Sequence, residues 1–128
     1  MSEDLKEYIR QWITKADRDL LAAQTIFAYK PLITDIICFH CQQASEKYLK
    51  AFILFKGEKI TKTHSVDFLL QTCVTLDIDF SSMDAKNLDD FAVEARYPDS
   101  FLSPELSEVE YYLQLSTRIK QLVEKKIS

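Results

Sequence analysis

The most informative part of this chain is the stretch Cys38-Phe39-His40-Cys41-Gln42-Gln43-Ala44-Ser45-Glu46-Lys47-Tyr48-Leu49-Lys50-Ala51. At about 100° per residue, an α-helix brings His40, Gln43, Lys47 and Lys50 within about 80° of one another, with Glu46 beside them. The remaining faces of this helix are mostly apolar and hold Ile37, Cys41, Ala44, Tyr48, Ala51, Phe52 and Phe55. A helix of this kind lines a polar groove or meets a partner. The alternative is a solvated stripe with one Glu46–Lys50 ion pair, worth a few tenths of a kcal/mol.

The composition indicates one globular domain made of helices. The chain has 128 residues, of which 47% are hydrophobic, and this is enough for a single packed core. One Gly and three Pro leave few breaks, which favours long helices over many short strands. We therefore expect an all-α fold, an up-and-down bundle of about five helices in a single domain spanning residues 1–128.

The charge and the apolar runs exclude several classes of protein. The net charge of −4 gives no general attraction to nucleic acid or to an anionic membrane, so any contact with RNA must come from a local cationic cluster. The longest uninterrupted apolar run, residues 51–55, is too short to span a bilayer. The acidic start at residues 1–4 does not resemble a signal peptide, and three Cys do not suggest a disulfide framework. We expect a cytoplasmic protein with no membrane partner.

Two long helices are expected in the first half of the chain. Apolar residues recur at steps of three and four over Leu5–Phe27, and Ser2 is a suitable N-cap for this helix. The helix ends before Pro31, because the residue before a proline avoids helical dihedral angles. The second helix runs from about Thr34 to Lys56, and Gly57 suits its C-cap.

Three further helices are expected in the second half. The third begins at Thr63 as N-cap. The fourth opens at Ser81, where Asp84 completes an approximate capping box, and it frays near residue 97. The last uses the Ser-Pro pair at residues 103–104, with Ser as cap and Pro at the first helical position.

A series of motifs follows one order along the chain, and together they resemble a known family. They are Trp12…Ala16…Asp19-Leu20, the helix of residues 38–51, Lys62-Thr63-His64-Ser65, and Glu94-Ala95-Arg96-Tyr97-Pro98-Asp99. In this order they resemble a prokaryotic HEPN domain over almost the whole chain. The resemblance implies an all-helical homodimer that binds nucleotide or RNA. It also implies a small nucleotidyltransferase as partner, in a toxin–antitoxin or nucleotide-handling pair.

The chain departs from the catalytic pattern of this family. Many HEPN proteins are metal-independent endoribonucleases with an Arg and a His that are separated by four to six intervening residues. In this sequence Arg96 is followed at the corresponding positions by residues 101–103, Phe-Leu-Ser, and the two His stand at positions 40 and 64. RNA cleavage needs a general base and a general acid, so the incomplete motif favours a binding role over catalysis.

The candidate ligand-binding or phosphate-binding residues are Arg96, Lys47, His40, Gln43, Tyr97 and His64. Arg96 could hold a phosphate through two parallel hydrogen bonds, and Tyr97 could stack on a base. The alternative for Arg96 is a salt bridge to Glu94 or Asp99, or an interaction of its charge with the end of a helix.

The other candidates also have structural alternatives. His40 could act as an acid or base, or its ring could be hydrogen-bonded to Gln43 or to a neighbouring helix. His64 could contact the ligand, or it could serve to anchor the start of the third helix. Lys47 and Lys50 could bind phosphate, or they could be exposed residues that favour solubility.

No metal and no cofactor are expected. Cys38 and Cys41 flank His40, but a structural zinc site needs four ligands, and only Cys73 and His64 remain to complete one. Buried reduced cysteines, acting as small hydrophobic residues, explain the pair. Acidic residues that could meet Mg²⁺ are better explained as a solvated helix face: Asp84, Asp89, Asp90 and Glu94.

Three functions remain open at this point. The first is a nucleotide- or RNA-binding HEPN-like homodimer that partners a nucleotidyltransferase, with Arg96 as the phosphate clamp. The second is a metal-independent endoribonuclease that uses Arg96 with His40 or His64. The third is a structural module whose dimer surface is its whole function.

Overall fold

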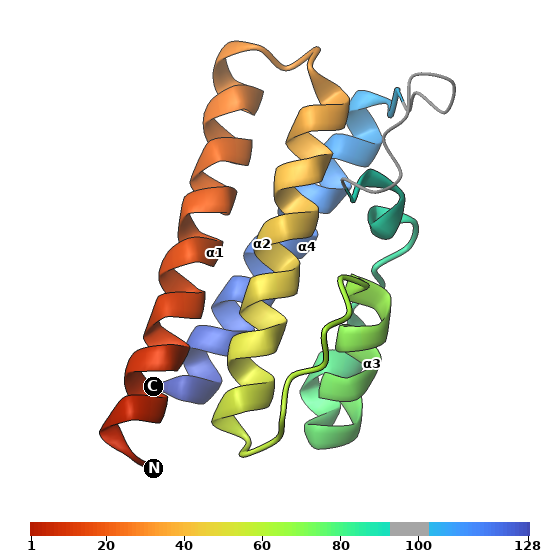
Figure 1. Cartoon of the computed structure of the whole chain (residues 1–128). Coiled ribbons are helices and arrows are strands. Elements are labelled where there is room, and N and C mark those ends of the chain that lie inside the picture. Colours follow the sequence, from red (N-terminus) through yellow and green to blue (C-terminus); the bar gives the residue numbers. More distant parts are fainter. Residues whose placement is uncertain (93–102) are drawn as a thin grey trace.

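The computed structural model describes residues 1–92 and 103–128, and these residues form a bundle of helices (Figure 1). The elements are α1 (Glu3–Tyr29), α2 (Thr34–Phe55), α3 (Val66–Leu76), the 3₁₀ helices η1 (Ile78–Ser82) and η2 (Leu88–Phe91), and α4 (Leu106–Ile127). No strand occurs in the described residues, and the expected all-α fold is confirmed. None of these helices is long and apolar enough to cross a membrane.

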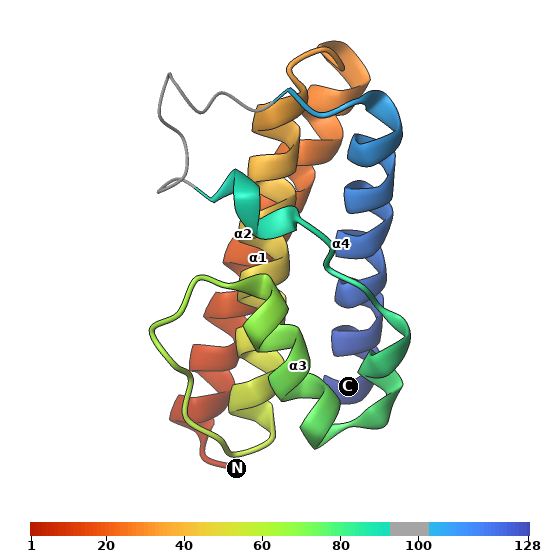
Figure 2. The same cartoon turned by 90° about the vertical axis from the view of Figure 1, so that its right-hand side faces the viewer.

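Helix α2 is the centre of the bundle. It packs against α1, α3, α4 and η2, and Figures 1 and 2 show it surrounded by them. Large side chains of α2 such as Tyr48, Leu49 and Phe52 are fully buried. Small residues bring α4 close to α2, where the hydroxyls of Ser45 and Ser116 lie 2.8 Å apart in the core. Because α2 is covered on nearly every side, its polar residues must find partners inside the protein.

The first two helices begin and end close to where local sequence signals place them. The Ser2 hydroxyl accepts a hydrogen bond from the Leu5 amide at 3.1 Å, and α1 ends at Tyr29. After α2, Gly57 adopts φ 81°, and the amides of Gly57 and Glu58 donate to the carbonyls of Leu54 and Ile53. This is the Schellman arrangement, which closes a helix with a left-handed residue.

The caps of the third and last helices differ from the prediction. The N-cap of α3 is Ser65, whose hydroxyl accepts from the Phe68 amide, whereas Thr63 accepts from the Ser65 amide. The N-cap of α4 is Glu105, which forms a capping box with Glu108. In each case a better-placed acceptor lies two residues beyond the predicted cap and satisfies the first amides of the helix.

The predicted fourth α-helix from Ser81 is wrong over its described part. The chain forms η1 and η2 instead, and between them the Asp84 carboxylate accepts a hydrogen bond from the Lys86 amide at 2.8 Å. Lys86 itself adopts φ 47°. A left-handed residue beside a local Asp turn stops an α-helix, because Asp offers the backbone a competing hydrogen bond.

Candidate functional site

The polar side chains on one face of α2 form a polar stripe, which consists of His40, Gln43, Glu46, Lys47 and Lys50. Asp19 of α1 holds two of them, His40 and Lys47. Its carboxylate pairs with Lys47 through one oxygen and lies 3.4 Å from His40 Nδ1 through the other. The side chains are 20%, 18% and 24% exposed for Asp19, Lys47 and His40. Burial opposes ionisation of Asp19, but hydrogen bonds and charge from His40 and Lys47 outweigh it and keep its pKa below the ordinary value. Lys47 and His40 therefore share one ionised carboxylate.

Glu46 holds Lys50 of the polar stripe and His64 before α3. Its carboxylate lies 3.5 Å from Lys50 Nζ and 3.0 Å from His64 Nδ1. The side chains of Glu46 and Lys50 are only 5% and 6% exposed, whereas that of His64 is 60% exposed. Lys50 Nζ also lies 5.4 Å from the centre of the Trp12 ring. Of the two alternatives for this face, the solvated Glu46–Lys50 pair is wrong, because Trp12 of α1 and His64 before α3 lie against the pair.

Gln42 and Gln43 link α2 to the segment that leads into α3. Gln43 Nε2 donates to Gln42 Oε1 at 2.8 Å, and Gln42 Nε2 donates to the His64 carbonyl at 2.7 Å. Gln42 Nε2 also lies 3.3 Å from Asp89 Oδ1. Gln42 is completely buried, so these bonds supply the partners that its amide needs. They fix the backbone of His64 beside α2.

Asp89 of η2 caps α3 from a distant part of the chain. One carboxylate oxygen accepts from the Val66 amide at 2.7 Å, and the other accepts from the Asp67 amide at 3.1 Å and the Ser65 hydroxyl at 2.9 Å. The N-terminus of a helix attracts anions through its free amides and its dipole. The carboxylate of Asp89 occupies this anion position at the N-terminus of α3. The expectation that Asp89 belongs to a solvated helix face is therefore wrong.

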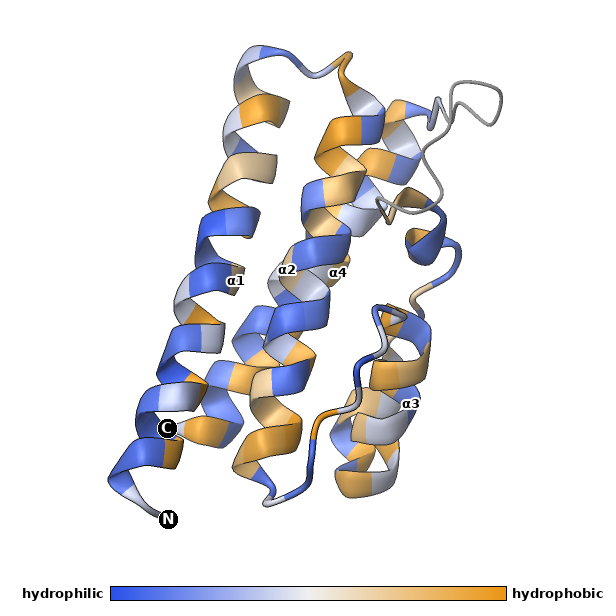
Figure 3. Ribbon diagram, in the orientation of Figure 1, coloured by the Kyte–Doolittle hydropathy of each residue, from blue (hydrophilic) through white to orange (hydrophobic). Residues whose placement is uncertain are grey.

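The described candidates lie along one side of the bundle. His40 and Lys47 meet at Asp19, while Gln43 and His64 are joined through Gln42 (Figure 3 shows the hydrophilic middle turns of α2 in blue). Arg96 and Tyr97 lie outside the described residues. Whether these side chains bind a ligand stays a prediction.

Two of the carboxylates that organise these groups, Asp19 and Asp89, are not singled out by sequence reasoning, whereas Glu46 is. Asp19 stands there only as part of a motif, and Asp89 only as one of several acidic residues. Spacing on α2 brings cations to one face, but the partner of each cation comes from α1 or from α2 itself. A polar residue predicted inside a buried helix is itself the useful signal, since it requires a partner.

The cysteines have no role in this arrangement. Burial raises the pKa of Cys38, Cys41 and Cys73 to about 12 each. Cys41 accepts a hydrogen bond at its carbonyl from the Ser116 hydroxyl, deep between α2 and α4. In residues 1–92 and 103–128 no group of three or more His, Cys, Asp or Glu side chains is placed to hold a metal ion.

The comparison with family models and the comparison with solved structures agree on the family of this chain. The family model of the HEPN domain matches residues 9–126. ST0689, an archaeal HEPN homologue with a crystal structure, has 23% sequence identity to this chain and a TM-score of 0.66. The structural match covers 94% of this chain and 98% of that chain. The crystal structure of TT1696 from Thermus thermophilus is 29% identical with a TM-score of 0.71, over 92% of this chain and 97% of that chain. No curated protein matches the sequence.

Proposed function

Because this chain belongs to the HEPN domain family, we propose that it is a nucleotide- or RNA-binding homodimer that partners a small nucleotidyltransferase, as in a toxin–antitoxin pair. The observation that carries the proposal is a group of three partly exposed side chains, each held by a carboxylate: His40 and Lys47 of α2, and His64 just before α3. Such groups are already positioned before a phosphate arrives, which lowers the entropic cost of binding.

The charges around these side chains are balanced in two sets. Asp19 faces Lys47 and His40, and Glu46 faces Lys50 and His64. Each set therefore balances one lysine against one carboxylate, and the imidazole of the same set can donate a ring N–H to a phosphate oxygen.

Titration calorimetry with ATP and with a short single-stranded RNA, in the presence of a chelator, tests the proposed binding. Lys47→Met and Arg96→Ala are expected to weaken binding at least tenfold, and Lys125→Met serves as the control because Lys125 is exposed on α4. Circular dichroism checks that each variant is folded. Equal affinity in the folded variants and in the control would contradict the proposal.

The proposed partnership needs its own experiment. The neighbouring reading frames are first searched for a small nucleotidyltransferase, which is then co-expressed with this chain carrying an affinity tag, and the pair is purified together. A stable complex and the expected dimer mass in light scattering support the proposal. Failure of two soluble proteins to copurify would contradict the partner, whatever the outcome of the ligand titration.

A second candidate function is metal-independent endoribonuclease activity, and His64 is the observation that favours it. Its ring is largely exposed, while its Nδ1 faces the buried carboxylate of Glu46. This carboxylate can hold the ring in one orientation through Nδ1. The imidazole would take the proton of a ribose 2′-hydroxyl, whose oxygen attacks the adjacent phosphorus. The bond from phosphorus to the 5′-oxygen breaks as that oxygen takes a proton from water, and the imidazolium returns its proton to the remaining hydroxide. The product is a 2′,3′-cyclic phosphate.

Incubation of purified protein with RNA and a chelator distinguishes catalysis from binding alone. The enzyme candidate predicts cleavage that is lost in His64→Ala and kept in Lys125→Met. Intact RNA in every sample, together with measurable RNA affinity, leaves the binding function as the better description.

A further inference from the structure

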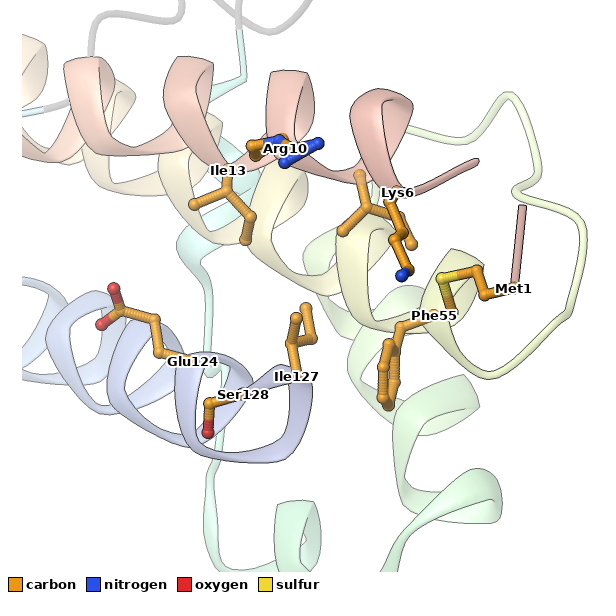
Figure 4. A pocket seen from close by; sticks show the side chains of 9 residues that line it. Met1, Lys6, Arg10, Ile13, Phe55, Glu124, Ile127 and Ser128 are labelled. Carbon is orange, nitrogen blue, oxygen red and sulfur yellow. The ribbon is translucent and has the colours of Figure 1, made fainter. Parts of the chain in front are cut away.

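A cavity of about 610 Å³ lies at the end of the bundle where both ends of the described chain meet, away from the polar stripe (Figure 4). Its apolar lining comes from three helices: Ile9 and Ile13 of α1, Phe55 of α2 and Ile127 of α4. Ile13, Phe55 and Ile127 are only half-buried, so they present apolar surface to the cavity. Its volume lies within the range of pockets that bind small organic ligands.

The cavity exists because α1 packs mainly on α2 and makes few contacts with α4. Midway along the bundle, Asp17 bridges this gap by accepting hydrogen bonds from Tyr48 and from Lys120, the latter at 2.9 Å. Towards the end of the bundle, Ile13 and Ile127 line opposite walls and leave the space between them open. A ligand that covers this apolar surface lowers the free energy of the system, because it removes the surface from water.

The rim of the cavity carries charge of both signs on opposite walls. Lys6 and Arg10 stand one turn apart on α1, and Glu124 stands across from them on α4 (Figure 4). Lys6 pairs with Glu3 at 3.4 Å and Arg10 with Glu7 at 3.1 Å, all at exposed positions. Such exposed pairs are weak, so both cations can turn to a ligand. Glu124 repels an anion from the other wall.

We propose that this cavity binds a single-chain amphiphile with an anionic head group. The apolar chain would cover Ile9, Ile13 and Ile127, and the head group would pair with Lys6 and Arg10. The inference does not depend on the function proposed for the polar stripe, because the two groups of residues share no side chain.

Calorimetry with octanoate, decanoate and dodecanoate, each below its micelle concentration, measures the contribution of the chain. A buried methylene is worth about 0.8 kcal/mol, so each added carbon is expected to tighten binding about fourfold. Decanol has the same chain without the charge, and it is expected to bind at least tenfold more weakly than decanoate.

Matched variants measure the contribution of the head group. The double variant Lys6→Gln/Arg10→Gln is expected to weaken decanoate binding at least tenfold. Lys15→Gln/Arg18→Gln removes two other exposed cations of α1 and is expected to leave binding unchanged. All four positions are exposed, so both variants are expected to fold.

Isoleucine δ1-methyl resonances report where decanoate binds. Those of Ile9, Ile13 and Ile127 are expected to shift, while those of the exposed Ile33 and Ile78 stay in place. Shifts at all five methyls would show non-specific association and overturn the proposal. So would decanol binding as tightly as decanoate, equal losses in the two double variants, or no shift at all.

Discussion

Replacement of Asp89 by Asn is expected to destabilise the protein more than the same replacement at its neighbour in η2, Asp90. The Asp89 carboxylate accepts from the amides of Val66 and Asp67 and from the Ser65 hydroxyl. In Asp89→Asn one acceptor oxygen becomes an NH₂ group, which faces donors. Hydrogen bonds to a charged group contribute about 1.5–3 kcal/mol each, and the interaction with the helix dipole adds about 0.5 kcal/mol.

The expected loss is therefore about 2–3 kcal/mol, since the Ser65 hydroxyl can rotate and accept from the new amide. This is a large part of the stability of a typical domain, which is about 5–15 kcal/mol. Urea unfolding followed by circular dichroism gives the free energy of unfolding. Asp90→Asn is the matched control, because Asp90 is the exposed neighbour of Asp89.

Hydrogen exchange supplies an independent measurement. The Val66 and Asp67 amides lie in the first turn of α3, where no carbonyl of the helix can accept from them. Their exchange is expected to accelerate in Asp89→Asn and to stay unchanged in Asp90→Asn. Equal free energies of unfolding in the two variants, with equal exchange at Val66 and Asp67, would refute the role assigned to this carboxylate.

Three further predictions concern the other buried groups. Asp19→Asn should lower the free energy of unfolding by about 1–2 kcal/mol at neutral pH. Because the pKa of Asp19 is depressed in the folded protein, this stabilisation is complete above about pH 4 and is lost as the pH falls through the folded pKa. Urea unfolding of the variant and the native protein should therefore differ at neutral pH and agree in acid. Glu46→Gln leaves the buried Lys50 without its counter-charge and should lower the free energy of unfolding by about 3 kcal/mol. The double variant Glu46→Gln/Lys50→Met should recover part of this loss in the same assay. A double variant no more stable than Glu46→Gln would contradict the pairing. The thiols of Cys38, Cys41 and Cys73 should resist a disulfide reagent at mildly alkaline pH until the protein unfolds. Burial raises the pKa of each thiol to about 12, so little reactive thiolate is present. Rapid labelling of the folded protein would contradict this prediction.

Local signals predict the first half of the fold well. Ser2 and Gly57 act through hydrogen bonds to residues only a few positions away, so their roles are visible in the sequence. The apolar spacing along α1 predicts which of its residues are buried, and Ala16, Leu20 and Ala23 are among them. Interactions of this kind depend on the helix itself and not on the rest of the fold.

The second half of the fold depends on contacts that spacing cannot show. The left-handed Lys86 interrupts the segment in which a helix is expected, although Lys rarely adopts that conformation. Lys86 Nζ lies 3.9 Å from the centre of the Tyr111 ring of α4, which is a contact between distant parts of the chain. A helix prediction based on a capping-box pattern includes neither effect.

Helical spacing predicts the candidate site as a face but not as a set of partners. Periodicity groups His40, Gln43 and Lys47 on one side of α2, which the structure confirms as a helix over these residues. It does not show that Asp19 of α1 accepts from Lys47, because this depends on how far one helix is displaced along the other. It also does not show that Lys50 is buried, because the residues that cover it come from other elements.

The arrangement of α1 and α2 has a consequence for the order of folding. A short connection, residues 30–33, joins these helices, and their packing is the most extensive in the bundle. Contacts between neighbours in the sequence cost little loop entropy, whereas the Ser45–Ser116 contact must close a loop that contains η1 and η2. We therefore expect the antiparallel pair of α1 and α2 to form first and α4 to dock late in folding. Replacement of a buried side chain of α4 by a smaller one should then mainly accelerate unfolding. An equal-sized replacement in the interface of α1 and α2 should mainly slow folding.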